Sequence, residues 1–225
     1  MRAGIRAAAI ALVTLAGTVA AQAPGIPVAN AGAARGLTVG GMVAFPNAAA
    51  GDGRALGATG AIGFRRVALV GQVTRVTDVP ADEDGYYGAG GALVLKVAGG
   101  PLVPVAVYLL AGAGYAAIGT GVNEADQLHV PVSLGISWTI PQPVVALKPW
   151  VAPRIDHRRY SVSPLLAKAG AGGLDYTTTD FGLSGGLTLG FLNGIGIDLA
   201  FDRVFSDGPG SKPTIFGVGL SWNLR

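Results

Sequence analysis

Large apolar residues alternate with small or polar residues along most of this chain. In the last segment, Phe216, Val218, Leu220, Trp222 and Leu224 are large and apolar, and the residues between them are Gly, Gly, Ser and Asn. A period of two residues is typical of β-strands, because successive side chains point to opposite faces of the sheet. The pattern therefore predicts an all-β fold whose strands have one large apolar face and one small face.

The alternation divides the chain into ten predicted strands. The connections between them alternate between long and short, and Asn193-Gly194 is a strong signal for a tight hairpin turn. An even number of strands, with short turns at one end and long loops at the other, is typical of a transmembrane up-and-down barrel. We favour ten strands, with eight as the alternative; the segments are residues 36–45, 55–65, 67–77, 86–97, 102–118, 128–140, 146–160, 177–192, 195–205 and 213–224.

The composition favours a closed barrel in lipid over a soluble sandwich. The water-facing side of a soluble sheet is polar, and we would expect it to carry many Lys and Glu residues. This chain has 37 Gly but only four Lys and two Glu. Strands in lipid must satisfy every backbone N–H and C=O group, which only a closed barrel allows. We therefore expect apolar side chains to face lipid and small ones to face a narrow lumen.

One segment also permits a different interpretation. Residues 101–122 carry no charge and are long enough for a membrane-spanning helix. The segment contains Pro104 and several Gly, and Val103, Val105 and Val107 follow the period of two. We therefore interpret it as a strand.

The N-terminus has the pattern of a secretory signal peptide. Residues 1–6 carry two Arg, residues 7–20 are apolar, and Ala21-Gln22-Ala23 has small residues at the cleavage positions. We expect a signal peptide over 1–23, a flexible periplasmic segment over 24–34 and the barrel over 35–225. Because the signal holds two of the 16 basic residues and none of the 13 acidic ones, the mature chain has a net charge of +1.

Together these features resemble the small outer-membrane β-barrel proteins of Gram-negative bacteria, broadly the OmpA/OmpX-like group. The resemblance rests on the signal, the Gly-rich alternating strands, the short turns and a last strand ending Gly217-Val218-Gly219-Leu220-Ser221-Trp222-Asn223-Leu224. It implies integral insertion in the outer membrane, contact with lipid (lipopolysaccharide above all) and assembly through the C-terminal strand by the barrel-assembly machinery. Such barrels commonly end in an aromatic residue, whereas this chain ends in Arg225, so Leu224 would take the terminal role.

Two groups of charged residues are candidate site residues. Arg154 and Arg158 have the inward parity of their strand, and Asp198 and Asp202 have the inward parity two strands along, so we expect a lumenal ion-pair network among these four. Arg75, Arg159 and Arg203 have the outward parity near the long-loop end. Because a guanidinium matches phosphate geometry, we expect these three to contact lipid phosphate in the outer leaflet.

The sequence carries no strong catalytic signal. The chain has no Cys, so a thiol nucleophile and Cys-based zinc sites are excluded. His129 and Ser133 lie about 13 Å apart along a strand, and Asp156 and His157 point to opposite faces. We expect no enzyme activity, cofactor, metal or nucleic-acid partner, and we predict a structural or passive barrel. The alternative is a small porin-like diffusion channel, and a third possibility is an outer-membrane protease or lipid-modifying enzyme; the oligomeric state stays open.

Overall fold

The computed structural model describes residues 23–27, 36–79, 85–99, 103–118, 125–162, 175–206 and 212–224. The predicted signal peptide, apart from Ala23, and residues 28–34 of the predicted periplasmic segment lie outside the described residues. Ten strands and one short 3-10 helix, η1 (Ala48–Ala50), make up the described fold. The strands are β1 (Gly36–Pro46), β2 (Arg54–Phe64), β3 (Val67–Thr77), β4 (Tyr86–Ala98), β5 (Val105–Ile118), β6 (Ala125–Trp138), β7 (Val145–Val162), β8 (Tyr176–Phe191), β9 (Ile195–Phe205) and β10 (Thr214–Leu224).

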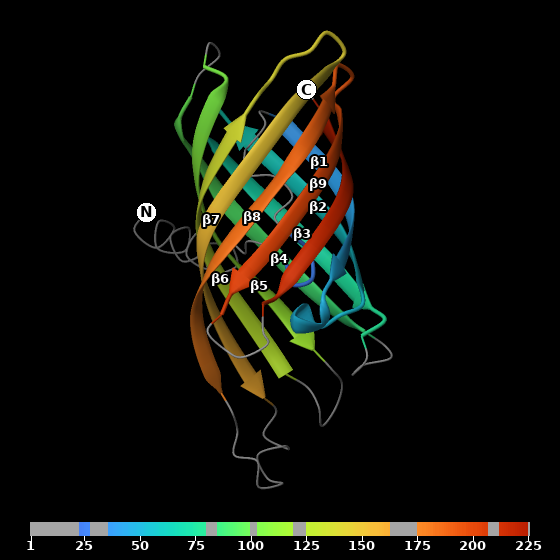
Figure 1. Cartoon of the computed structure of the whole chain (residues 1–225), viewed down its shortest axis with the longest axis vertical. Coiled ribbons are helices and arrows are strands. Elements are labelled where there is room, and N and C mark those ends of the chain that lie inside the picture. Colours follow the sequence, from blue (N-terminus) through green and yellow to red (C-terminus); the bar gives the residue numbers. More distant parts are fainter. Residues whose placement is uncertain are drawn as a thin grey trace, which may run out of the picture.

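The strands form one closed antiparallel barrel (Figure 1). Each strand pairs with its neighbours in the sequence, and β1 pairs with β10 along almost its whole length, from Leu37 opposite Leu224 to Pro46 opposite Ile215. The predicted all-β, ten-stranded up-and-down barrel is therefore confirmed, and the alternative count of eight is wrong. The predicted bounds agree with the observed ones to within three residues.

The segment for which a helix was considered forms a strand instead. Residues 105–118 are β5, which pairs with both β4 and β6. Within the described part of the chain, no helix has the length and apolar character needed to cross a membrane.

The two ends of the barrel differ in their connections. At the end that holds Leu224, short turns join the strands, such as Arg65-Arg66 between β2 and β3. In the turn between β8 and β9, Gly194 has a φ of 85°, and the Asn193 side chain accepts a hydrogen bond from the backbone N–H of Ile195. The connection between β1 and β2, which contains η1, lies at the opposite end, the lower one in Figure 1, where the strand order also puts the chain positions of the other longer connections. We call the two ends the short-turn end and the long-loop end.

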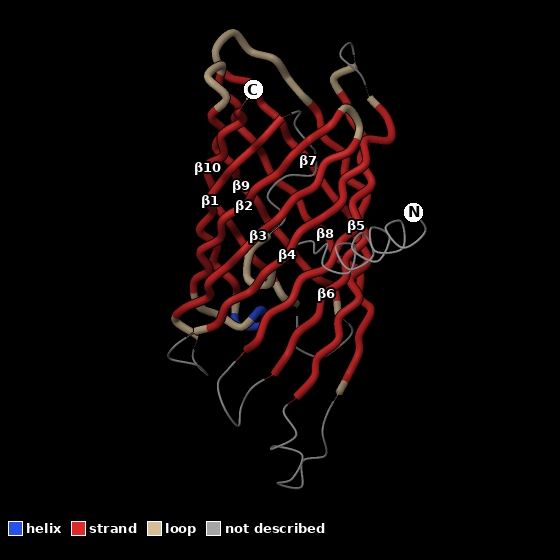
Figure 2. Tube along the Cα trace, turned by 180° about the vertical axis from the view of Figure 1, so that it is seen from behind, coloured by secondary structure: helices blue, strands red, loops and turns tan. Residues whose placement is uncertain are grey.

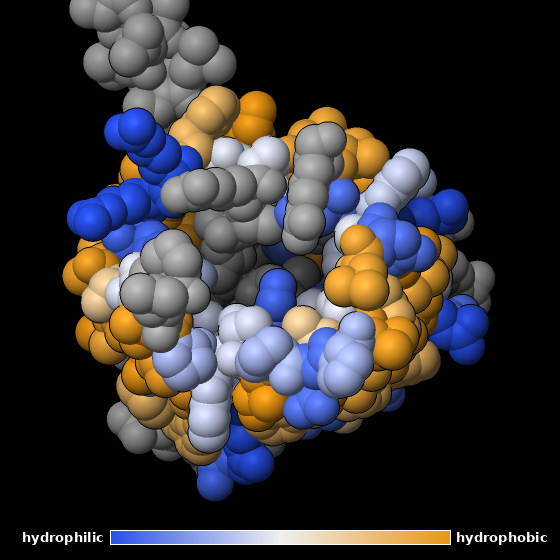
Figure 3. Space-filling view, turned by 90° about the horizontal axis from the view of Figure 1, so that it is seen from above, coloured by the Kyte–Doolittle hydropathy of each residue, from blue (hydrophilic) through white to orange (hydrophobic). Residues whose placement is uncertain are grey.

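The outer wall is apolar. Large side chains with the outward parity are exposed on every strand, including Phe64, Val73, Ile155 and Leu220. Seen along the barrel in Figure 3, hydrophobic residues surround a central hollow in which hydrophilic residues are visible. Small and polar residues with the inward parity are buried, as the pattern predicts.

Candidate functional site in the barrel lumen

The described part of the N-terminal segment lies inside the barrel. Residues 23–27 are surrounded by strands (Figure 2), and Ala23 and Ile26 have no exposed surface. The backbone N–H of Ala23 donates to Oε1 of Gln72 at 3.2 Å, and Oγ1 of Thr74 donates to the carbonyl oxygen of Pro24 at 3.0 Å. Residues 24–27, expected in a periplasmic segment, are thus held by side chains of β3 that point into the lumen.

Glycines in the barrel wall make room for this segment. A Cβ atom at Gly57 would lie 2.8 Å from Cδ1 of Ile26, and one at Gly217 would lie 2.8 Å from Cγ of Pro27. Both distances are shorter than any normal carbon contact. The inward glycines of β2 and β10 therefore form the surface against which the N-terminal segment packs.

Ile26 belongs to an apolar cluster at the long-loop half of the lumen. It packs with four small or medium side chains and one tyrosine, which come from five consecutive strands. Packing against these side chains removes Ile26 from water. For a residue of this size, that burial stabilises the folded state by about 1.5–3 kcal/mol. The other members are Ala44, Ala55, Val76, Tyr86 and Ala116.

An ion-pair network occupies the opposite side of the same half of the lumen. Arg154 of β7 lies at its centre, and its side chain is 1% exposed. Its Nε donates to both carboxylate oxygens of Asp156 at 2.9 Å, its Nη2 donates to Oδ2 of Asp202 at 2.9 Å, and its Nη1 donates to Oδ1 of Asp202 and to Oγ of Ser184. The network therefore joins the lumenal faces of the adjacent strands β7, β8 and β9.

Asp156 connects this centre to two further groups. Nε2 of His129, on β6, lies 2.8 Å from Oδ1 of Asp156, and Nη2 of Arg158 donates to Oδ2 at 3.2 Å. Asp156 has no exposed side-chain surface. A buried carboxylate is costly unless it is paired and hydrogen-bonded, and here three side chains compensate it.

The structure brings together part of the predicted lumenal network. Arg154 and Asp202 form a direct pair. The expected partners of Arg158 are corrected, because Arg158 donates to Asp156 of its own strand. The expected partners of Asp198 are corrected as well, because Asp198 accepts a hydrogen bond from Oγ1 of Thr188 at 2.6 Å, nearer the short-turn end.

Sequence reasoning missed His129, Asp156 and Ser184 as partners in this network. Their inward parity is visible in the sequence, but their proximity depends on the register of four strands. The register places His129 opposite Arg158 and Ser184 opposite Asp202. The contact of the N-terminal segment with the barrel wall could have been predicted from three inward-facing glycines. These are Gly57, Gly88 and Gly217, which leave space beside the first strands.

Two further apolar clusters line the rest of the described lumen. Met42 and Trp150 pack together near the middle of the barrel with Ala152 and Ala200. Toward the short-turn end, Tyr108 packs with apolar side chains of β3, β4 and β5. The lumen is thus lined by apolar clusters as well as by the ion-pair network.

The three outward arginines have different surroundings. The guanidinium of Arg75 lies over the ring of Tyr87, 5.5 Å from its centroid, and that of Arg203 lies over the ring of Phe205 at the same distance. Arg159 instead donates to Asp175 at 3.3 Å, between two exposed side chains. The hydrogen bond from Ser161, followed by that from Arg159, lowers the pKa of Asp175.

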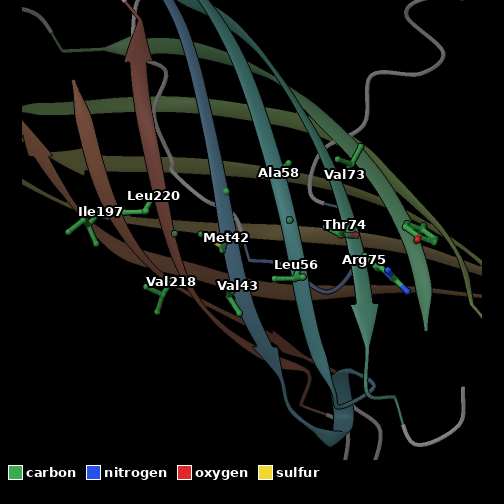
Figure 4. Close-up of a pocket in the computed structure, with 14 residues that line it drawn as sticks. Met42, Val43, Leu56, Ala58, Val73, Thr74, Arg75, Ile197, Val218 and Leu220 are labelled. Carbon is green, nitrogen blue, oxygen red and sulfur yellow. The ribbon is translucent and has the colours of Figure 1, made fainter. Parts of the chain in front are cut away.

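Arg75 lies at the edge of a shallow apolar groove on the outer wall. The groove has a volume of about 800 Å³ and extends over six neighbouring strands, β9, β10, β1, β2, β3 and β4. Val43, Leu56 and Val73 line it, and Figure 4 shows Arg75 on β3 beyond Val73. The arginine therefore adjoins an apolar surface that would face lipid in a membrane.

The apolar outer wall and the closed strand order together identify the architecture. An apolar outer wall cannot face water over this area, and a closed antiparallel barrel leaves no unpaired strand edge in lipid. The chain is an outer-membrane-type β-barrel.

No protein-family model matches the chain, and no curated protein matches it. Solved structures similar to it include the N-terminal β-barrel domain of Pseudomonas aeruginosa OprF, at 13% identity and a TM-score of 0.38, covering 84% of this chain and 96% of that one. The attachment invasion locus protein Ail of Yersinia pestis has 12% identity and a TM-score of 0.40, with 85% and 100% covered. The outer membrane protease OmpT of Escherichia coli has 9% identity and a TM-score of 0.42, with 84% and 94% covered. At these TM-scores the likenesses carry no argument about function.

Proposed function

We propose that this protein is an integral outer-membrane barrel with a structural or passive role, whose lumen is closed to solutes. The proposal rests on one observation: two separate groups of residues, which we call the two fillings, occupy the long-loop half of the lumen. Residues 24–27, which follow the expected cleavage after Ala23, occupy the side next to β1–β5 and β10, and the network around Arg154 occupies the side next to β6–β9. In the proposed closed barrel, a path for water or solutes forms only when one of these two fillings is displaced.

A small diffusion channel is the second candidate function. Lumenal charges tune selectivity in open barrels, and Arg158 and His129 lie where such charges would act. The burial of Arg154, Asp156 and Asp202 argues against an open path beside them.

Single-channel recording in planar bilayers separates these two functions. We expect the refolded mature chain to give no conductance steps. A variant that begins at Arg35, and so lacks the lumenal segment, should give measurable conductance because half of the filling is removed. Reproducible steps of one size from the intact chain would overturn the closed barrel and support the channel.

The lumenal network supports a structural role better than a catalytic one. His129 and Asp156 are paired as in many acid-base sites, but Nε2 of His129 is occupied by the carboxylate and the side chain is 6% exposed. The hydroxyl of Ser184 donates to Asp202 at 2.9 Å and accepts from Arg154. These side chains pair with one another and stabilise the barrel, and we propose no reaction at this site.

The proposed contacts with the membrane follow the surroundings of the outward arginines. Arg75 and Arg203 lie against aromatic rings on the outer wall at the long-loop end, where lipid phosphate would reach them. Arg159 is paired with Asp175, so it is the weaker candidate. Recognition of β10 by the barrel-assembly machinery, with Leu224 as the terminal residue, stays part of the same proposal.

A further inference from the structure

The tight turn between β2 and β3 carries two arginines at the short-turn end of the barrel. Phe64 pairs with Val67 across the hairpin, so only Arg65 and Arg66 lie in the turn. All four side chains are exposed, and they line a shallow hollow of about 630 Å³. Within the part of the chain that the structure describes, neither guanidinium has an ion pair or a hydrogen bond. Both are therefore accessible to a ligand.

The backbone of this turn is unfavourable for arginine. Arg65 has a φ of 45°, in the left-handed region that glycine adopts freely and that residues with long side chains rarely adopt. The turn between β8 and β9 has Gly194 at its position of positive φ. Residues that keep a costly backbone conformation cluster at functional sites. The geometry of the hairpin thus favours a residue other than the one found at position 65.

The two ends of the barrel differ in charge. Exposed aspartates such as Asp52 and Asp175 lie at the long-loop end. Asp198 is the acidic residue that the described short-turn half contains, and it is buried in the lumen. Cationic side chains of the short-turn end are Arg65, Arg66, Lys96 and Lys148. A ligand of this end would therefore be negatively charged.

Aromatic side chains locate the turn relative to the membrane. Phe64 is 62% exposed, and Trp138 and Trp222 are exposed at the same end of the barrel. The aromatic girdles of transmembrane barrels lie at the two membrane–water interfaces. Because Arg65 directly follows Phe64, the turn lies at the depth of the lipid headgroups in the periplasmic leaflet. Phosphate is the anionic group found at that depth.

We propose that this turn binds the headgroup of an anionic phospholipid. The guanidinium groups of Arg65 and Arg66 donate to the phosphate oxygens, and the acyl chains pack against Phe64 and Val67. The described turn has no acidic side chain that would attract the ammonium group of a zwitterionic lipid. The site lies at the opposite end of the barrel from the proposed contacts of the outward arginines, and it does not depend on whether the lumen is closed.

Phosphatidylglycerol is a suitable probe, and phosphatidylethanolamine is its counterpart without net charge. The mature chain is folded in detergent and titrated with each lipid, and the bound lipids are counted by native mass spectrometry. We expect phosphatidylglycerol to bind about tenfold more tightly, because two cations lie near its phosphate. Equal binding of the two lipids would overturn the proposal. Displacement of phosphatidylglycerol by an equal concentration of inorganic phosphate, or of a soluble muropeptide, would contradict a lipid site.

Variants of the turn locate the site. Arg65→Gly combined with Arg66→Asn introduces residues that hairpin turns favour, so this barrel should be at least as stable as the parent while it loses the preference for phosphatidylglycerol. Arg65→Lys with Arg66→Lys keeps both charges and should retain part of the preference. Arg54→Gln, at the opposite end of β2, is the matched control and should bind as the parent does.

A heat-modifiable gel shift shows that each variant is folded. An unchanged lipid preference in the folded Arg65→Gly, Arg66→Asn variant would overturn the proposal. An equal loss of preference in the Arg54→Gln control would place the lipid away from the turn and would contradict it as well.

Discussion

Arg154 is the residue on which the lumenal network depends most. Its guanidinium contacts Asp156, Asp202 and Ser184, and all four side chains are buried. Removing one member of a buried ion pair leaves the other charge without compensation, which is far more costly than the pair is stabilising. The Arg154 side chain therefore fills part of the lumen and also stabilises the association of β7, β8 and β9.

Arg154→Leu should lower the free energy of unfolding by about 3–5 kcal/mol, because Asp156 and Asp202 each lose a buried partner. Arg159→Leu is the matched control on the same strand, and since its pair with Asp175 is exposed it should cost no more than about 1 kcal/mol. Urea unfolding in detergent, followed by tryptophan fluorescence, gives both values. Equal costs for the two variants would show that the lumenal network does not stabilise the barrel.

Substitution of Gly57 tests the contact between β2 and the N-terminal segment. A Cβ atom there would lie 2.8 Å from Ile26, whereas Gly60, with outward parity on the same strand, has open space. Because the chain has no Cys, an Ile26→Cys variant reports on this position with a single thiol. We expect slow maleimide labelling of that thiol in the parent and with Gly60→Val, and fast labelling with Gly57→Val. Fast labelling in all three would place residue 26 outside the lumen.

At the scale of the elements, the strands could be predicted from the sequence because the signal is local. Alternating parity, the Asn193-Gly194 turn and the alternation of loop lengths depend on residues that are close together in the chain. The contact of Ile26 with β2 and the pairing of His129 with Asp156 depend instead on register and closure, which bring distant residues together. Arg158 shows the limit clearly, since parity predicts that it faces the lumen but does not determine which aspartate it meets.

The ends of β3 and β9 carry the proposed lipid contacts. Arg75→Gln combined with Arg203→Gln should reduce the amount of lipopolysaccharide that co-purifies with the barrel, because both guanidinium groups lie on the outer wall over aromatic rings. Arg159→Gln, whose arginine is paired with Asp175, should change it less. Mass spectrometry of lipids bound to the detergent-purified variants measures this. Unchanged lipid in the double variant would remove the proposed phosphate contact.

In the molecule as a whole, residues that are far apart in the sequence together fill the lumen. The first described residues pack against β1–β4 and β10, and the charged side chains of β6–β9 complete the filling. The outer wall and the closed strand order suit lipid. Residues 24–27 of the N-terminal segment thus lie in the lumen.

A disulfide cross-link between positions 26 and 57 tests this placement of the N-terminal segment. The mature chain carrying Ile26→Cys and Gly57→Cys is refolded in detergent under mild oxidation, and the remaining free thiols are counted by mass spectrometry after alkylation. We predict near-complete loss of free thiols in this pair and none in the matched pair Ile26→Cys with Gly60→Cys, whose second position faces outward. Equal alkylation of both pairs in folded barrels would contradict an N-terminal segment inside the lumen.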